Sequence, residues 1–351
     1  MADSTLTSAP QCEVVKWHTR QKHEFIRQYL SVWTNRVAKS GRNTPKLSLV
    51  DLFASYGWCR SDPKVEPGVQ REPWPGSAIL AARALVAYPR PQALVLNSFN
   101  PSSASETAAQ SGALTANLLA EVGPNPPFRV ERLSEPVMGA ARKAATFVDL
   151  NYPSVWMLDP YYPESLPWTV VEYVANLKRD YHTSGGTASR RPELLITFIT
   201  EGLQRNVDVN PRTIDLALGM QRAAWQGRLA KLRASGANVR EGLISIFAEN
   251  LHAIYGKPPT VIEVDGSPGN IVYAILLCSS HDAGTFVPKI LVKPEFQAWR
   301  VSNWKPTARL ITKNRTIRRT SGAKAPIQRS LDEPLGSRSS QATDATSGNS
   351  S

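Results

Sequence analysis

Hydrophobic and polar residues alternate along the chain in two periods, which predict a regular succession of strands and helices. Short apolar runs rich in Val, Leu and Ile are typical of buried strands, whereas apolar residues three and four positions apart indicate amphipathic helices. The predicted strands cover residues 46–54, 92–99, 128–134, 154–160, 193–199, 270–280 and 286–293. The predicted helices cover residues 23–40, 78–88, 107–123, 138–150, 167–181 and, as one helical block, 212–255.

The first predicted helix shows its amphipathic pattern clearly. One stripe contains the apolar residues Phe25, Ile26, Tyr29, Leu30, Trp33 and Val37. The basic residues of this segment, including Lys22 and Arg27, are expected on its other faces. We therefore expect the helix to pack on the core through the stripe and to expose its charges to solvent.

The order of these elements predicts the fold class. Strands that alternate with helices favour an α/β protein with a mostly parallel sheet and helices on both faces. The last two predicted strands, joined by a short turn at 281–284, predict one antiparallel strand beside the parallel ones. This combination favours the Rossmann-like, methyltransferase-type variant of the doubly wound fold over a dehydrogenase.

The same pattern suggests how the chain is divided. We expect a flexible leader at 1–11, one Rossmann-like domain at 12–304 that contains a helical insertion at 207–260, and a tail at 305–351. The tail has lost its apolar periodicity and is rich in Ser, Thr, Ala, Gly and Arg, so it is predicted to be disordered.

Charge is concentrated in that tail. The chain has a formal net charge of +12, and residues 305–330 contain eight Lys and Arg but no acid. A basic tail suits a polyanion, so nucleic acid is an expected partner. The alternative is a tail that serves only solubility, because charge runs are often simply solvated.

Other features limit the class of protein. The longest apolar run, 271–278, is too short to span a bilayer, and the N-terminus lacks the apolar core of a signal peptide. The three cysteines are isolated, which indicates a reducing compartment, and no Cys or His pair has metal-ligand spacing. We therefore expect a cytoplasmic protein without a membrane segment or a bound metal.

The end of the first predicted strand is a candidate cofactor loop. In a doubly wound sheet, ligands bind beyond the carboxyl ends of the strands. There the sequence Asp-Leu-Phe-Ala-Ser-Tyr-Gly resembles the first motif of S-adenosylmethionine-dependent methyltransferases. The expected cofactor residues are Asp51, Phe53, Ser55 and Gly57, together with Asn97 at the end of the next strand. The alternative is an edge loop with incidental small residues.

The end of the fourth predicted strand is a candidate catalytic site. Its sequence Asp-Pro-Tyr-Tyr, residues 159–162, is similar to the Asp-Pro-Pro-Tyr motif of amino-methyltransferases. In that motif the acid accepts hydrogen bonds from the target amine and an aromatic ring stacks on the planar substrate. The matching residues are Asp159, Tyr161 and Tyr162. The alternative is an ordinary turn after a strand, where Asp and Pro are common.

Six segments in register extend the resemblance to one family. They are KHEFIRQYLSVW, LVDLFASYG, PGSAILAARAL, PSVWMLDPYYPESLPWTVVEYV, ELLITFITEGLQRN and IVYAILLCSSHDAGTFV. Together they span roughly residues 16–293, and with them the chain resembles the three-Cys-motif partner proteins of bacteria. The resemblance implies a Rossmann-like methyltransferase fold and a partner protein that bears cysteines, but no proven reaction.

Two positions depart from the expected motifs. Ser55 stands where the family prefers glycine, and serine does not easily adopt a positive φ. Asn97 stands where many methyltransferases place an acid that binds the cofactor ribose. An amide can still accept a hydrogen bond, but it loses ~1–2 kcal/mol of charge assistance.

The sequence thus favours an S-adenosylmethionine-dependent, methyltransferase-like protein. Its expected substrate bears an amine, with nucleic acid as the expected class, and it would act with a partner protein. The alternative is a pseudo-methyltransferase, a non-catalytic scaffold that binds nucleic acid or protein. Cofactor binding would distinguish the two.

Overall fold

The computed structural model describes most of the predicted domain. The described residues are 9–39, 44–61, 72–183, 186–267, 270–279 and 299–303. All of them belong to one compact unit, residues 1–317, whereas a second unit, 318–351, lies outside them. Most of the predicted leader, the predicted strand 286–293 and the tail 305–351 also lie outside the described residues.

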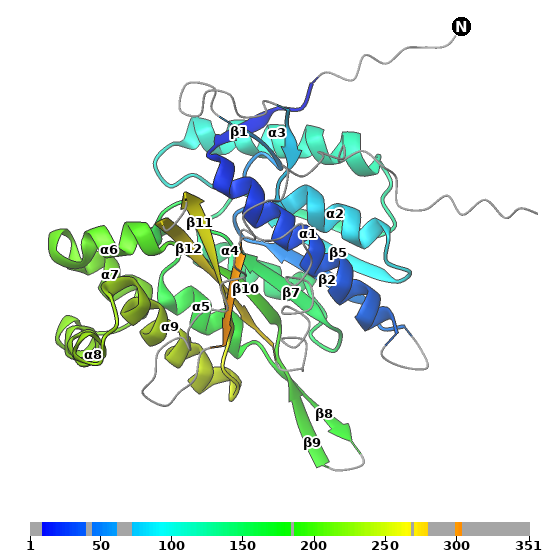
Figure 1. The fold of residues 1–351 in the computed structure, drawn as a ribbon. Coiled ribbons are helices and arrows are strands. Elements are labelled where there is room, and N and C mark those ends of the chain that lie inside the picture. Colours follow the sequence, from blue (N-terminus) through cyan, green and yellow to red (C-terminus); the bar gives the residue numbers. More distant parts are fainter. Residues whose placement is uncertain are drawn as a thin grey trace, which may run out of the picture. The chain divides into compact units, whose positions relative to one another are not determined.

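An eight-stranded sheet forms the centre of this unit, in the order β13-β11-β12-β10-β7-β2-β5-β6 (Figure 1). The strands are β2 (Leu47–Asp51), β5 (Pro91–Asn97), β6 (Arg129–Leu133), β7 (Ser154–Leu158), β10 (Glu193–Phe198), β11 (Thr260–Ser267), β12 (Asn270–Cys278) and β13 (Trp299–Asn303). Strands β6, β5, β2, β7 and β10 run parallel to one another. Because β12 is antiparallel to both β10 and β11, it is a reversed strand between two of the common direction. This confirms the predicted Rossmann-like, methyltransferase-type fold.

Only the first strand of the predicted antiparallel pair is described, because 286–293 lies outside the described residues. The strand 270–280 is present as β12, but its hairpin partner is β11, at Thr260–Ser267. The sequence pattern predicts no strand in this segment, which lies between the helical block 212–255 and the predicted strand 270–280. Its β-branched residues and the Gly-Ser-Pro-Gly sequence that follows are hairpin signals, so the strand was recognisable.

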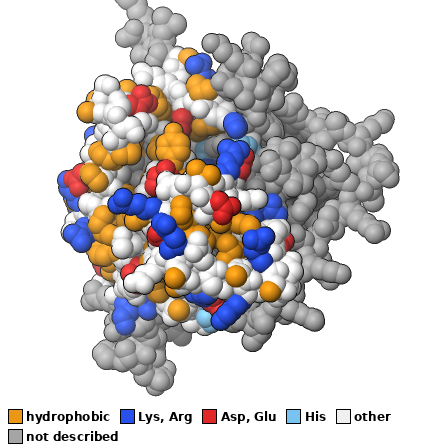
Figure 2. All heavy atoms as spheres, turned by 90° about the vertical axis from the view of Figure 1, so that its left-hand side faces the viewer, with side chains coloured by type: hydrophobic (Ala, Val, Ile, Leu, Met, Phe, Trp, Pro, Cys, Tyr) orange, Lys and Arg blue, Asp and Glu red, His pale blue; other side chains and the backbone are white. Residues whose placement is uncertain are grey.

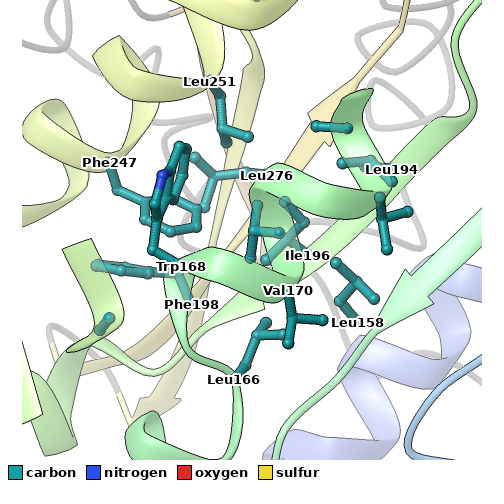
Figure 3. Packing of buried hydrophobic residues seen from close by; sticks show 14 of the residues in the cluster. Leu158, Leu166, Trp168, Val170, Leu194, Ile196, Phe198, Phe247, Leu251 and Leu276 are labelled. Carbon is teal, nitrogen blue, oxygen red and sulfur yellow. The ribbon is translucent and has the colours of Figure 1, made fainter. Parts of the chain in front are cut away.

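Helices cover both faces of the sheet. One face carries α1 (Trp17–Ala38), α2 (Ser77–Val86) and α3 (Ala104–Val122), and the other carries α4 (Val137–Phe147), α5 (Trp168–Asn176) and α9 (Val239–Tyr255). Successive strand residues supply the two cores alternately: Leu49 packs with the first group and Val50 with the second. In the second core, Trp168 and Phe198 both pack on Phe247 (Figure 3).

The predicted helical insertion is present between β10 and β11 and begins earlier than expected. It consists of α6 (Thr200–Val209), α7 (Pro211–Leu218), α8 (Arg222–Ala234) and α9. Fully buried Trp225 attaches α8, and its Nε1 donates a hydrogen bond to Asp215 at 2.6 Å. Asn238 and Glu241 form a capping box that starts α9. No helix in the described part of the chain is both long and apolar enough to cross a membrane.

The predicted helix 167–181 is shorter than expected. Helix α5 ends at Asn176, and the chain then forms a hairpin of β8 (Arg179–Thr183) and β9 (Gly186–Arg190). The two glycines at 185–186 are a turn signal that the helical pattern of the preceding segment concealed.

A small second sheet lies beside the end of β2. It pairs β1 (Cys12–Val15) in parallel with β3 (Trp58–Ser61), and β3 with the short β4 (Trp74–Pro75). The backbone amide of Gly76 donates to the carbonyl of Gly57 at 2.8 Å. A Cβ on Gly76 would lie 2.9 Å from that carbonyl oxygen, so this contact requires glycine.

Candidate functional site

Asp51, the last residue of β2, is a buried carboxylate with incomplete hydrogen bonding. Its Oδ1 accepts a hydrogen bond from the Phe53 amide at 3.0 Å, whereas Oδ2 is buried without a partner. Burial raises the pKa of this carboxyl to about 6, and the nearby Ser77 hydroxyl and the Phe53 amide lower it only in part. Ionising Asp51 is therefore less favourable than ionising an exposed carboxyl, and a hydrogen-bond donor or a cation beside Oδ2 would reduce that cost.

The turn after β2 is strained at the position where glycine was expected. Ser55 has a φ of +48°, and it is the single non-glycine residue with a positive φ among those described. Its side chain is buried and its Oγ has no hydrogen-bond partner, while Ser98 Oγ donates to its carbonyl at 3.1 Å. Gly57, at φ +79°, completes the turn. A left-handed serine costs ~1–2 kcal/mol, and such strain concentrates at functional sites.

Asn97 uses its amide to hold the loops around this turn. Nδ2 donates to the carbonyls of Leu52 at 3.2 Å and Glu135 at 3.1 Å, and Oδ1 accepts from the Glu135 amide at 3.1 Å. The residue is 2% exposed. Asn97 thus ties the β2 turn to the loop after β6, and an acid could not replace its two donated hydrogen bonds.

Asp159, just beyond the end of β7, forms a buried ion pair. Lys22 Nζ lies 2.7 Å from Oδ1 and 2.6 Å from Oδ2, and both side chains are at most 10% exposed. Burial by itself would raise the pKa of Asp159, but the Lys22 ammonium and neighbouring His23 outweigh it, and the pKa is lowered. Asp159 is therefore a compensated carboxylate that carries its charge at neutral pH.

Lys22 is a site residue that the sequence interpretation missed. It was expected on an exposed face of α1, but it is 7% exposed and lies 5.4 Å from the Tyr273 ring. Its position three residues before Phe25 and four before Ile26 places it on the apolar stripe of the helix. A lysine within such a stripe requires an acid across the core, which was the available signal.

The two tyrosines of the second motif lie in different environments. Tyr161 packs edge-on against Phe53, with ring centroids 6.3 Å apart, and its hydroxyl is buried without a partner. Burial and the Glu13 carboxylate raise its pKa, and the Ser55 hydroxyl lowers it in part. Tyr162, by contrast, is 64% exposed.

The two predicted motifs meet at one edge of the sheet. Strands β2 and β7 are neighbours, with Asp51 paired to Met157 in the ladder. We call Asp51, Phe53, Ser55, Gly57 and Tyr161 the β2-turn site. The structure brings these five residues together. Asn97 instead fixes the backbone of the β2 turn through its hydrogen bonds, and Tyr162 is exposed to solvent.

A small pocket lies beyond Asp159. Its volume is about 260 Å³ when space open to solvent is included. Its lining comes from Pro160 and the residues that follow it, from the end of β10 and from helices of the insertion. The lining residues are Pro160, Pro163, Leu166, Ile196, Thr197, Phe198, Ile199, Leu203, Ala217 and Phe247. The space inside it that a water molecule can occupy is only about 20 Å³, room for roughly one water, so the pocket is far too small to hold a ligand.

The helical insertion presents basic side chains. Helix α8 contains Arg222, Arg228, Lys231 and Arg233 and no acid. Arg222 and Arg228 form ion pairs with acids of α7 and α9, while Lys231 and Arg233 are exposed. Lys and Arg side chains are interspersed with hydrophobic ones on the side of the molecule that carries α6 to α9 (Figure 2). Among the described residues, no three His, Cys, Asp or Glu are grouped to hold a metal ion.

Comparisons with known proteins give only distant similarity. No protein-family model matches the sequence, and no curated protein matches it. Among solved structures, the protein LPL1258 from Legionella pneumophila, of family DUF519, is 9% identical with a TM-score of 0.43, over 83% of this chain and 98% of that one. The small RNA methyltransferase HEN1 is 12% identical with a TM-score of 0.31, over 78% of this chain and 27% of that one.

Proposed function

We propose that the protein is a methyltransferase-like protein that binds S-adenosylmethionine at the β2-turn site. One observation carries this proposal: buried oxygens of Asp51, Ser55 and Tyr161 lack hydrogen-bond partners at the carboxyl ends of two adjacent parallel strands. Ligands of doubly wound sheets bind at this edge. Unsatisfied buried polar groups cost ~1–3 kcal/mol each, and a polar ligand would remove that cost.

In this proposal each predicted cofactor residue has a physical task. Asp51 and Ser55 offer oxygen atoms to the ligand, and the Phe53 ring forms an apolar wall against Tyr161. Gly57 allows the chain to turn at positive φ, where a Cβ would already lie 3.0 Å from Leu114 Cδ1. Asn97 acts by holding the turn through its amide.

The proposed substrate is an amine-bearing planar group, with nucleic acid as the substrate class. Asp159 would accept hydrogen bonds from the amine, which requires Lys22 to yield one of the two carboxylate oxygens. Tyr161 would close the cofactor side, and exposed Tyr162 would stack on the substrate. Base–aromatic stacking contributes ~1–3 kcal/mol per base.

The proposal extends to family and partners. We assign the chain to the three-Cys-motif partner proteins on the six sequence segments, with a cysteine-bearing protein as its partner in the cytoplasm. Nucleic acid would be held by the basic tail, and exposed Lys231 and Arg233 of α8 offer a second basic region. Deleting 305–351 should then weaken nucleic-acid binding and make its salt dependence shallower.

Calorimetric titration with S-adenosylhomocysteine tests the cofactor assignment. The wild-type protein should bind it, and Gly57→Ala should weaken binding because the added Cβ strains the turn. Gly112→Ala is the matched control, since a Cβ there has open space around it. Thermal unfolding of each variant separates a lost site from a lost fold. Absence of binding to the folded wild-type protein at millimolar ligand would contradict the assignment.

A non-catalytic scaffold is the second candidate, and the Lys22–Asp159 pair favours it. Both oxygens of the expected catalytic acid are already engaged within the chain. A scaffold would bind nucleic acid or its partner through Tyr162 and the basic regions without methyl transfer. Transfer of a labelled methyl group to DNA or RNA, lost in Asp159→Asn, would support the enzyme over the scaffold.

A further inference from the structure

Strand β1 turns an acid inward and an apolar residue outward. Val14 is 48% exposed, whereas Glu13 is partly buried and pairs in register with Cys59, which is 4% exposed. Successive strand residues point to opposite sides, so exchanging the two side chains would suit burial better. Conflicts of this kind between local pattern and fold are expected at functional sites.

Helix α3 holds this strand against the β2 turn. Asn117 Nδ2 donates to the carbonyls of Gln11 and Tyr56, both at 2.8 Å. One amide therefore joins the residue that precedes β1 to the centre of the turn. Glu13 consequently lies close to Ser55: the nearby Ser55 hydroxyl lowers the pKa of both the Glu13 carboxyl and the Tyr161 phenol, although its Oγ forms no hydrogen bond of good geometry with either.

The charges around the turn do not balance. The nearby Asp159 carboxylate raises the pKa of both Glu13 and Asp51. Lys22 is the cation that lowers the pKa of all three carboxyls. Lys22 is held by both oxygens of Asp159. Within the described residues, Glu13 and Asp51 form no ion pair with a basic side chain, and burial raises the pKa of each.

A cluster of acids can simply be protonated, but the surrounding polar atoms indicate a ligand. Asp51 is 0% exposed and Ser55 is 5% exposed, yet Asp51 Oδ2 and Ser55 Oγ lack hydrogen-bond partners. A cation placed among these oxygens would satisfy them and also supply the missing positive charge.

We propose that Glu13 completes the β2-turn site and that this site selects a ligand with a positive charge beside the turn. The inference rests on the proposed function, because S-adenosylmethionine carries cationic sulfonium and ammonium groups. Glu13 then acts as a specificity residue supplied by the N-terminal strand, outside the motif that follows β2.

The test compares a cationic and a neutral ligand that share the same adenosine. Calorimetry measures the affinity of the full chain for S-adenosylmethionine and for methylthioadenosine, which lacks both cationic groups. Glu13→Gln should lower the affinity for S-adenosylmethionine by about tenfold or more and leave that for methylthioadenosine within about twofold. Glu121→Gln, an acid of α3 paired with Arg83, is the matched control and should change neither.

The outcomes separate this inference from the proposed function. Suppose that the wild-type protein binds S-adenosylmethionine. If Glu13→Gln then loses affinity equally for both ligands, or loses none for S-adenosylmethionine, the role of Glu13 is overturned and the cofactor assignment stands. Binding of neither ligand to the folded wild-type protein would overturn both. Thermal unfolding of Glu13→Gln verifies that the nearly isosteric change leaves the fold intact.

Discussion

The ends of strands β2 and β7 lie side by side in the sheet, but their acids are compensated differently. Asp159 beyond β7 has both oxygens bonded to Lys22, and its pKa is lowered. Asp51 at the end of β2 has one oxygen without a partner, and its pKa is raised to about 6. A carboxylate that is satisfied within the chain supports the fold, whereas one that is not satisfied is available for a ligand.

Breaking the compensated side should give the largest effect. Lys22→Met leaves Asp159 buried without its cation, and loss of one partner of a buried pair costs ~3–5 kcal/mol. Chemical denaturation should therefore show a free energy of unfolding lower by about that amount. Lys16→Met, at an exposed lysine just before α1, is the control and should change stability little. A cost for Lys22→Met no larger than that of the control would remove the contrast between the two strand ends.

The uncompensated carboxyl of Asp51 should make the stability of the protein depend on pH. The folded-state pKa of Asp51, about 6, lies above the unfolded value of ~3.9. The stability of the wild-type protein relative to Asp51→Asn should therefore be greatest below pH ~4 and should fall as pH rises through about 6. The expected change is on the order of 3 kcal/mol.

Urea denaturation of both proteins at several pH values between these limits measures this difference. Subtracting the variant cancels the titration of groups that do not interact with Asp51. A difference that rises with pH would mean that Asp51 is stabilised in its charged form, in which case the two strand ends would be alike.

The smallest effect concerns the strained turn. Ser55→Gly removes the penalty of a positive φ, partly offset by the greater chain entropy of glycine, so the protein should gain ~0.5–1 kcal/mol. Ser55→Ala keeps a Cβ and therefore the backbone strain, and serves as the control. Equal gains in the two variants would show that the unpartnered hydroxyl, rather than the backbone, carries the cost.

The local pattern of the sequence was sufficient to predict the central strands of the sheet but not strand β11 or the end of helix α5. Apolar runs such as 154–160 and 193–199 became fully buried strands, because a strand covered on both faces requires apolar residues throughout. Strand β11 was missed because Glu263 and Asp265 interrupt its apolar residues. Helix α5 was predicted too long because its helical pattern fades gradually into the hairpin β8–β9.

The candidate site was predictable only where a motif ends a strand. Asp51, Phe53, Ser55 and Gly57 follow β2, and Asp159 and Tyr161 follow β7, so topology brings them together once the strand order is known. Glu13 and Lys22 are contributed by β1 and α1, which no local motif marks. Their roles depend on contacts between residues far apart in the chain, such as Lys22 with Asp159.

The sequence by itself determined the alternation of strands and helices, the apolar stripe of α1 and the two polar strand ends, because each depends on spacing between near neighbours. The tertiary structure alone decided which charges are paired. Whether Lys22 is exposed or buried, whether Asn97 faces a ligand or holds two loops, and whether Asp51 has a partner all depend on what packs across the sheet. The energy of a charge is set by its three-dimensional surroundings, which the order of residues along the chain does not specify locally.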